Sequence, residues 1–99
     1  MSDESRLNEL AASAVRAQEL LDNELLVQAF ATLERGYIDA WRATMIDDAA
    51  GREKLFLAIN IVGKVRDHLA RVVADGRLAE AELKELAHMA ERKRRFGIL

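Results

Sequence analysis

Apolar residues recur at steps of three and four along most of the chain, a spacing that predicts amphipathic helices. The first predicted helix covers residues 3–21, and Ser2 or Asp3 is available as its N-cap. Its apolar stripe consists of Leu7, Leu10, Ala14, Ala17 and Leu21. The alanines in this stripe permit close packing against another helix.

A second predicted helix covers residues 23–45, with Asp22 and Asn23 as capping candidates. At about 100° per residue, one side of this helix gathers a continuous apolar stripe. The stripe consists of Leu26, Ala29, Phe30, Leu33, Tyr37, Ala40 and Thr44. We predict that it faces the core.

More apolar residues lie beside that stripe on the second helix. They are Val27, Ile38, Trp41 and Met45. Two interpretations are open, because the group forms either the shoulder of a wide core face or a contact surface for a subunit or partner.

The acidic segment IDDAAG ends the second pattern, and a third helix is predicted over residues 48–75. Asp47 or Asp48 is its candidate N-cap, and Gly76 fits the glycine that commonly follows a helix. A broad apolar arc on this helix is predicted to face both neighbours in a three- or four-helix arrangement. The arc consists of Leu55, Ala58, Ile59, Ile61, Val62, Val65, Leu69, Val72 and Val73.

Phe56 and Leu57 fall outside that arc and are further candidates for contact with another molecule. The alternative for Leu57 is a single exposed leucine of no special role. Gly36 and Gly63 lie inside the two long helices, where each costs about 1 kcal/mol relative to Ala. Each permits either a close helix crossing or a bend.

A fourth helix is predicted over residues 78–95, with a thin apolar stripe and a basic end. The stripe consists of Ala79, Leu83, Leu86 and Ala90. The basic, apolar-ended tail at 92–99 contains Arg92, Lys93, Arg94, Arg95, Phe96, Ile98 and Leu99. Cations for approach and apolar residues for anchoring favour docking on a subunit or larger partner, while packing back on the domain and weak DNA contact are alternatives.

These elements predict an all-α fold of three to four helices, built around a long antiparallel hairpin and forming one domain over residues 1–99. The composition agrees, with 51% hydrophobic and 5% aromatic residues and no proline. A chain of 99 residues buries only a modest core by itself, so a homo-oligomer is expected.

Charge is divided unevenly along the chain. The net charge is −2, yet residues 1–50 carry four Arg against ten Asp or Glu, while 51–99 carry eleven Arg or Lys against seven. Oppositely charged halves attract within one chain or between stacked subunits. No stretch is apolar enough to cross a bilayer, no cysteine is present, and a cytoplasmic location is expected.

Candidate chemistry is sparse. Glu85 and His88 have the i, i+3 spacing of di-iron carboxylate helices, but those sites need two such pairs, and His68 lacks the upstream Glu. No nucleophile elbow or glycine-rich phosphate loop is present. We therefore expect no metal, no cofactor and no enzymatic activity.

Arg66 lies at the edge of the third helix's apolar arc, where a cation requires a partner. Glu34 or Tyr37 of the second helix could supply one. The arginine then either ties the hairpin together or lines a pore or groove in an assembly.

The segments DNELLVQAFATLERGYIDAWRAT, REKLFLAINIVGKVRDHLARVVADGRL and RKRRFGIL together resemble small helical proteins of tailed-phage head and packaging modules. The resemblance covers roughly residues 22–99 and is greatest to the oligomerisation core of small terminase subunits. It implies ring assembly, contact with viral DNA and regulation of a large packaging ATPase. The separate helix-turn-helix domain of that family is missing from the sequence, so sequence-specific DNA recognition is not expected.

The sequence thus leads to a self-associating adaptor or regulator of phage-type DNA packaging or head assembly. One alternative is a small inhibitor or anti-repressor that binds a host protein through a surface centred on Trp41. Another is a DNA-binding accessory protein that uses its four terminal cations.

Overall fold

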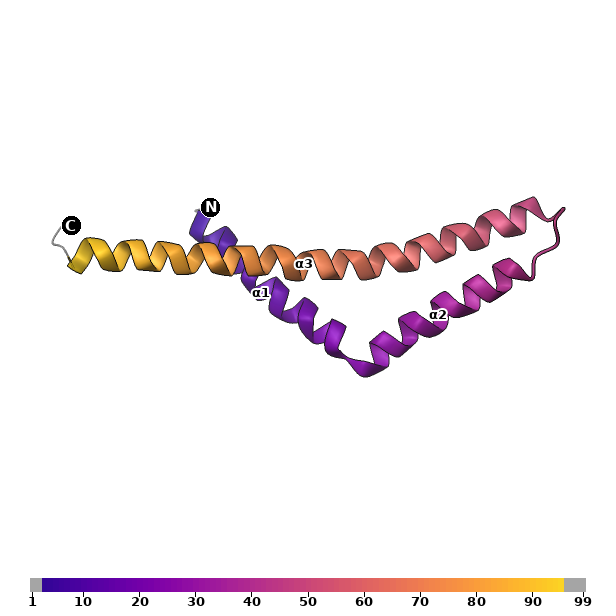
Figure 1. Cartoon of the computed structure of the whole chain (residues 1–99), viewed down its shortest axis with the longest axis horizontal. Coiled ribbons are helices and arrows are strands. Elements are labelled where there is room, and N and C mark those ends of the chain that lie inside the picture. The colour runs from indigo at the N-terminus through magenta and orange to yellow at the C-terminus, as the bar shows by residue number, and fades with distance from the viewer. Residues whose placement is uncertain (1–2, 96–99) are drawn as a thin grey trace. The chain divides into compact units, whose positions relative to one another are not determined.

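The computed structural model describes residues 3–95, and this part of the chain forms three helices joined at Asn23 and by residues 43–48 (Figure 1). Helix α1 spans Asp3–Asp22, α2 spans Glu24–Arg42, and α3 spans Ala49–Arg95. Residues 3–95 contain no strand, and the predicted all-α fold is confirmed. The predicted antiparallel hairpin corresponds to α2 and the first part of α3.

Local capping explains where α2 and α3 begin. The Asn23 side-chain oxygen accepts a hydrogen bond from the Leu26 N–H at 3.0 Å. The Asp48 carboxylate likewise accepts from the Gly51 N–H at 3.0 Å. Each cap satisfies an amide that has no partner inside its own helix, so both capping predictions are confirmed.

The predicted break at Gly76 is wrong. Helix α3 runs through this position without interruption, so the predicted helices over 48–75 and 78–95 are a single element. Gly76 is buried, and a Cβ atom built on it would overlap the Ala14 side chain and lie 2.8 Å from the Leu10 carbonyl oxygen. The glycine permits close approach of α1 and does not end the helix.

The chain divides into two compact units, the first formed by residues 1–18 with 71–99 and the second by residues 19–70. In the first unit, α1 packs against the later part of α3 through small and medium side chains. The buried hydrophobic residues are Leu7, Ala14, Ala17, Val73 and Ala79. The stripe predicted for residues 78–95 is buried at Ala79 but exposed at Leu86 and Ala90.

The second unit is the hairpin itself, in which α2 runs antiparallel to residues 49–70 of α3. No residue of α2 is buried. Leu26, Phe30 and Tyr37 are half-buried on the side that faces α3. Two helices by themselves leave most of each other's surface uncovered, which explains this shallow burial.

Several residues predicted to lie in the core are therefore exposed. Ala29, Leu33 and Ala40 of α2 and Ile61 and Val65 of α3 lie outside the contact between the two helices. Gly36 and Gly63 allow no close crossing either, because nothing among the described residues lies within 4 Å of a Cβ built at either position.

Candidate interaction surfaces

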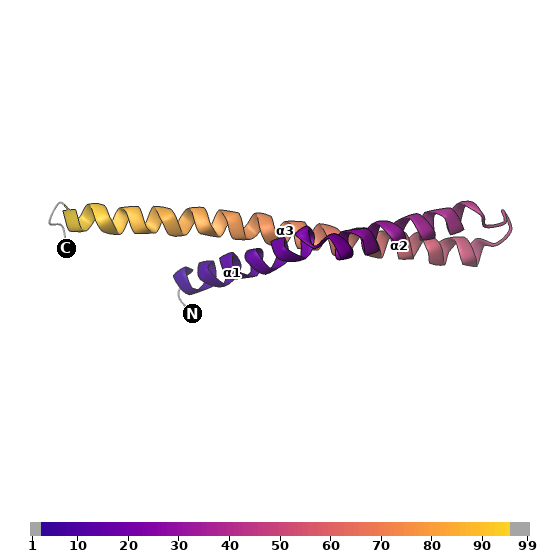
Figure 2. The ribbon, with the colours of Figure 1, turned by 90° about the horizontal axis from the view of Figure 1, so that it is seen from below.

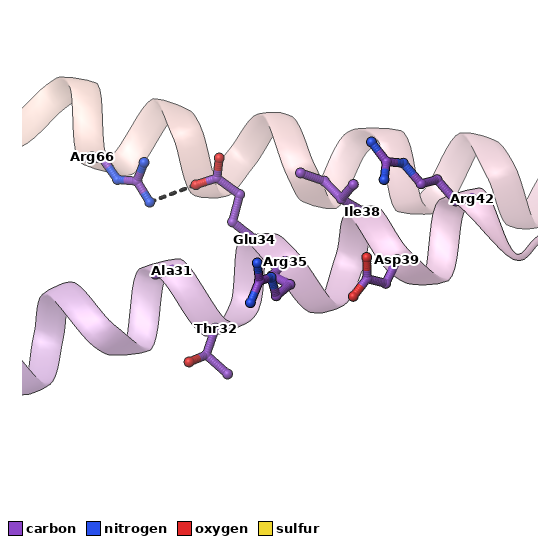
Figure 3. Close-up of a pocket in the computed structure, with 8 residues that line it drawn as sticks. All are labelled: Ala31, Thr32, Glu34, Arg35, Ile38, Asp39, Arg42 and Arg66. Carbon is purple, nitrogen blue, oxygen red and sulfur yellow. Dashed lines mark hydrogen bonds and ion pairs between the residues drawn. The ribbon is translucent and has the colours of Figure 1, made fainter.

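An ion pair joins the two helices of the hairpin. Arg66 Nη2 donates to Glu34 Oε2 at 2.7 Å (Figure 3). The guanidinium carbon of Arg66 also lies 5.8 Å from the centroid of the Phe30 ring. Of the two partners that the sequence offered, Glu34 is the one that Arg66 contacts. Both side chains remain partly exposed, so solvent screens the pair and its contribution to stability is modest.

Trp41 takes part in a second contact across the hairpin. The Arg52 guanidinium lies over its ring at 6.0 Å from the centroid, a distance at which a cation is attracted to the aromatic face. The side chain is 38% exposed. Trp41 therefore belongs largely to the hairpin and only partly to the free surface.

Charged side chains surround a surface depression between Arg66 and α2 (Figure 3). Its lining consists of Ala31, Thr32, Glu34, Arg35, Ile38, Asp39, Arg42 and Arg66. Cations and carboxylates alternate here with few apolar side chains, unlike the mainly apolar lining of small-molecule sites. We assign this depression to the polar side of the hairpin.

The contact residues predicted for α2 differ in exposure. Val27 is 48% and Met45 is 71% exposed, whereas Ile38 is half-buried. At about 100° per residue, Val27 and Ile38 share one flank of the helix, whereas Met45 follows the end of α2 at Arg42 and lies in the connection to α3. Trp41 is turned from that flank toward α3.

Phe56 and Leu57 are 52% and 50% exposed, so both side chains are available for contact. They point about 100° apart around α3, which places them on different sides of the hairpin. Their role in contact with another molecule stays a prediction, and the two residues would serve different surfaces.

A second apolar surface lies on the other flank of α2 and includes Ala29, Leu33 and Ala40, which were predicted to lie in the core. Its residues follow one another at steps of three and four, as Leu25, Ala29, Leu33, Gly36 and Ala40. Leu25 is 77% and Leu33 is 48% exposed, and the other three are small and exposed.

A matching row occupies α3 at steps of four residues. Leu57, Ile61 and Val65 are 50%, 59% and 46% exposed. On each helix, the residues of the row precede the residues of the α2–α3 contact by one position. Each row is therefore rotated by about 100° in the same sense around its own helix axis. Antiparallel helices turn in opposite senses when viewed from one end, so equal offsets place both rows on the same side of the pair. The two rows together form what we term the apolar hairpin face.

The four terminal cations form the last turn of α3, where they complement the negative end of the helix dipole. Arg92, Lys93, Arg94 and Arg95 are all exposed. Arg92 lies 3.9 Å from the Glu85 carboxylate, at the outer limit of an ion pair. The predicted anchors Phe96, Ile98 and Leu99 lie outside the described residues.

Residues 3–95 hold no group of three or more His, Asp or Glu side chains arranged to bind a metal ion. His68 and His88 are both exposed. None of the helices over these residues has the length and apolar character needed to span a membrane.

The fold and its surfaces define an all-α protein with a helical hairpin that leaves one apolar face uncovered. Comparison with protein-family models, with curated proteins and with solved structures gave no match.

Proposed function

We propose that this chain is a non-enzymatic, self-associating helical protein whose apolar hairpin face is covered by a second copy. The observation that carries the proposal is the contrast between α2, which has no buried residue, and the apolar row along its outer side. Burial of apolar area is the main source of folding stability, and a hairpin without a buried residue obtains little of it. A partner on this face would supply the missing burial.

The size of the face is compatible with such a partner. The 19 residues of α2 extend about 28 Å at 1.5 Å per residue, and two helices side by side are about 20 Å wide. The product is on the order of 560 Å² on each copy, or about 1,100 Å² in total. This area lies near the lower limit of specific protein interfaces.

The experiment is a measurement of molar mass by light scattering over a range of concentrations. We expect the natural chain to have the mass of an oligomer and Ile61→Glu to shift toward the monomer, because the substitution buries an unpaired charge in the interface. Val15→Glu is the matched control, since Val15 is 60% exposed on α1, outside the hairpin. A natural chain that remains monomeric at about 0.1 mM would contradict the proposal.

We further propose that the assembly acts as an adaptor for a larger partner, with the basic end of α3 as the contact. Support comes from the four exposed cations on one helical turn. Involvement in phage-type packaging or head assembly stays a prediction from the sequence resemblance.

Binding to DNA of arbitrary sequence tests the basic end. Replacing Arg92, Lys93, Arg94 and Arg95 by Ala should abolish a low-salt mobility shift, because about four phosphate contacts per chain would be lost. Changing Arg6 and Arg16, which are exposed on α1 outside the hairpin, to Ala is the control with fewer cations removed. A shift that survives the first variant would exclude the basic end as the DNA contact.

The inhibitor alternative receives less support from the structure. Its surface consists of Val27, Ile38, Trp41 and Met45. Val27 and Met45 are exposed, whereas Ile38 is half-buried and Trp41 contacts Arg52.

A further inference from the structure

We infer that two copies associate crosswise through the apolar hairpin face, so that α2 of each copy lies on α3 of the other and forms a four-helix bundle. The inference rests on the proposed self-association and specifies its geometry. It places Leu57 and Ile61 of α3 against Ala40 and Gly36 of α2.

The register within one hairpin sets the register between copies. Three contacts join α2 to α3 within one hairpin. Glu34 contacts Arg66, Phe30 contacts Arg66, and Trp41 contacts Arg52. The residue numbers in these pairs add to 100, 96 and 93. Opposite positions on α2 and α3 therefore have numbers that add to about 96. This relation places Gly36 level with Asn60 and Ala40 level with Phe56.

A twofold axis parallel to the helices relates the two copies by rotation without a shift along the axis. It brings α2 of one copy above α3 of the other and leaves each residue at its original level. Ile61 then faces Gly36 of the second copy, and Leu57 faces Ala40 of the second copy. Each of these two contacts occurs twice in the dimer, because the arrangement is symmetric.

Exposure and local space agree with this match. Ile61 and Leu57 are at least half exposed, so their side chains are free to insert. Gly36 and Ala40 are exposed, and the space around a Cβ at Gly36 is empty. A glycine in mid-helix costs about 1 kcal/mol relative to Ala, and a docking notch accounts for that cost.

Charge favours the crosswise arrangement over stacking of identical helices. Helix α2 carries three acidic and two basic residues, whereas residues 49–70 of α3 carry four basic and two acidic ones. In the crosswise arrangement, the net negative α2 of each copy lies against the net positive segment of α3 in the other copy. Stacking α2 on α2 and α3 on α3 would set like charges together.

Disulfide trapping tests the geometry directly, because the natural chain has no cysteine. Ala40→Cys and Leu57→Cys are prepared separately, one with a longer tag, then mixed and oxidised. We expect a linked heterodimer from the mixture and no linked homodimer from either variant alone.

The competing arrangement gives a different pattern. If α2 lies on α2 of the second copy, one of Ala29→Cys, Gly36→Cys or Ala40→Cys will link to itself, and the Ala40 and Leu57 variants will not link to each other. Efficient self-linking on α2 would overturn the crosswise inference and leave self-association intact. A monomeric mass for the natural chain would overturn both.

A second test exchanges the large and small side chains at the contact between Ile61 and Gly36. Gly36→Leu should raise the dissociation constant of the dimer about ten- to a hundredfold, because the notch is overfilled. Adding Ile61→Ala in the same chain should restore the dissociation constant to within about threefold of the natural value, since large and small have changed places.

Gly63→Leu is the control for the bulk exchange. It also adds a leucine to a helix position with open space, but it faces away from the apolar hairpin face, and the dissociation constant should be unchanged. Circular dichroism confirms that each variant is helical. An unaltered dissociation constant for Gly36→Leu, or no rescue by Ile61→Ala, would overturn the inference.

Discussion

Three glycines lie inside helices, and their surroundings differ although the residue is the same. Gly76 lies against the α1 backbone near Leu10 and against the Ala14 side chain, whereas Gly36 and Gly63 have open space around them. The cost in helix propensity is the same at all three positions. Their contributions to stability therefore differ through packing.

Substituting these glycines by alanine separates the two cases. Gly76→Ala should destabilise the fold by about 1–3 kcal/mol, because a methyl group there collides with α1. Gly63→Ala is the matched control and should stabilise by up to about 1 kcal/mol. Thermal unfolding followed by circular dichroism measures both effects. A neutral Gly76→Ala would show that α1 does not approach α3 closely at this point.

The Glu34 and Arg66 pair gives a smaller expectation. Glu34→Gln removes one charge and should cost no more than about 1 kcal/mol, because both side chains are partly exposed. Comparing unfolding in low salt and in about 1 M salt tests this, since the difference between natural chain and variant should shrink as salt rises. A difference that is independent of salt would show that hydrogen-bond geometry, not charge, is responsible.

The sequence could predict the Arg66 contact but not the role of Gly76. An arginine beside an apolar arc requires an acceptor, and Glu34 is one of few within reach. Gly76 fits two structures equally well, since a missing side chain serves both a helix end and a close crossing. Only the position of Ala14 across the contact decides between them.

Helix boundaries follow from local chemistry at the scale of elements. The Asn23 and Asp48 caps were predictable because a short polar acceptor ahead of an apolar run satisfies free amides. The length of α3 was not, because the glycine at position 76 imitates a stop signal. Which flank of α2 is covered also depends on a neighbour that the pattern of one helix cannot reveal.

Removing the α2 cap tests the contribution of local chemistry. Asn23→Ala should destabilise by about 1 kcal/mol, since the Leu26 amide loses its acceptor. Asn8→Ala is the control, because Asn8 is exposed in the middle of α1 and caps no helix. Denaturant unfolding of both variants provides the comparison. Equal midpoints would mean that packing alone sets the start of α2.

For the whole molecule, self-association couples stability to concentration. If the apolar hairpin face is covered by a second copy, assembly adds to the stability of the folded chain, and higher concentration favours the folded form. Each tenfold rise in concentration changes the free energy of a dimer by about 1.4 kcal/mol. The melting temperature should therefore rise with concentration for the natural chain.

Calorimetry from about 5 to 500 μM measures this dependence. The Gly36→Leu variant, which fills the proposed notch, should show a flatter dependence over the same range. A melting temperature of the natural chain that does not change with concentration would count against coupled assembly.

The tryptophan near the turn of the hairpin has a practical consequence. The sequence contains one Trp, and the Arg52 guanidinium of α3 lies over its ring, within the contact between α2 and α3. Helices α2 and α3 lie side by side at this end of the hairpin (Figure 2). The wavelength of the Trp41 fluorescence should thus report the opening of α2 from α3, whereas separation of the two copies should leave that wavelength nearly constant. The chain carries an intrinsic optical probe that distinguishes dissociation from unfolding without any label.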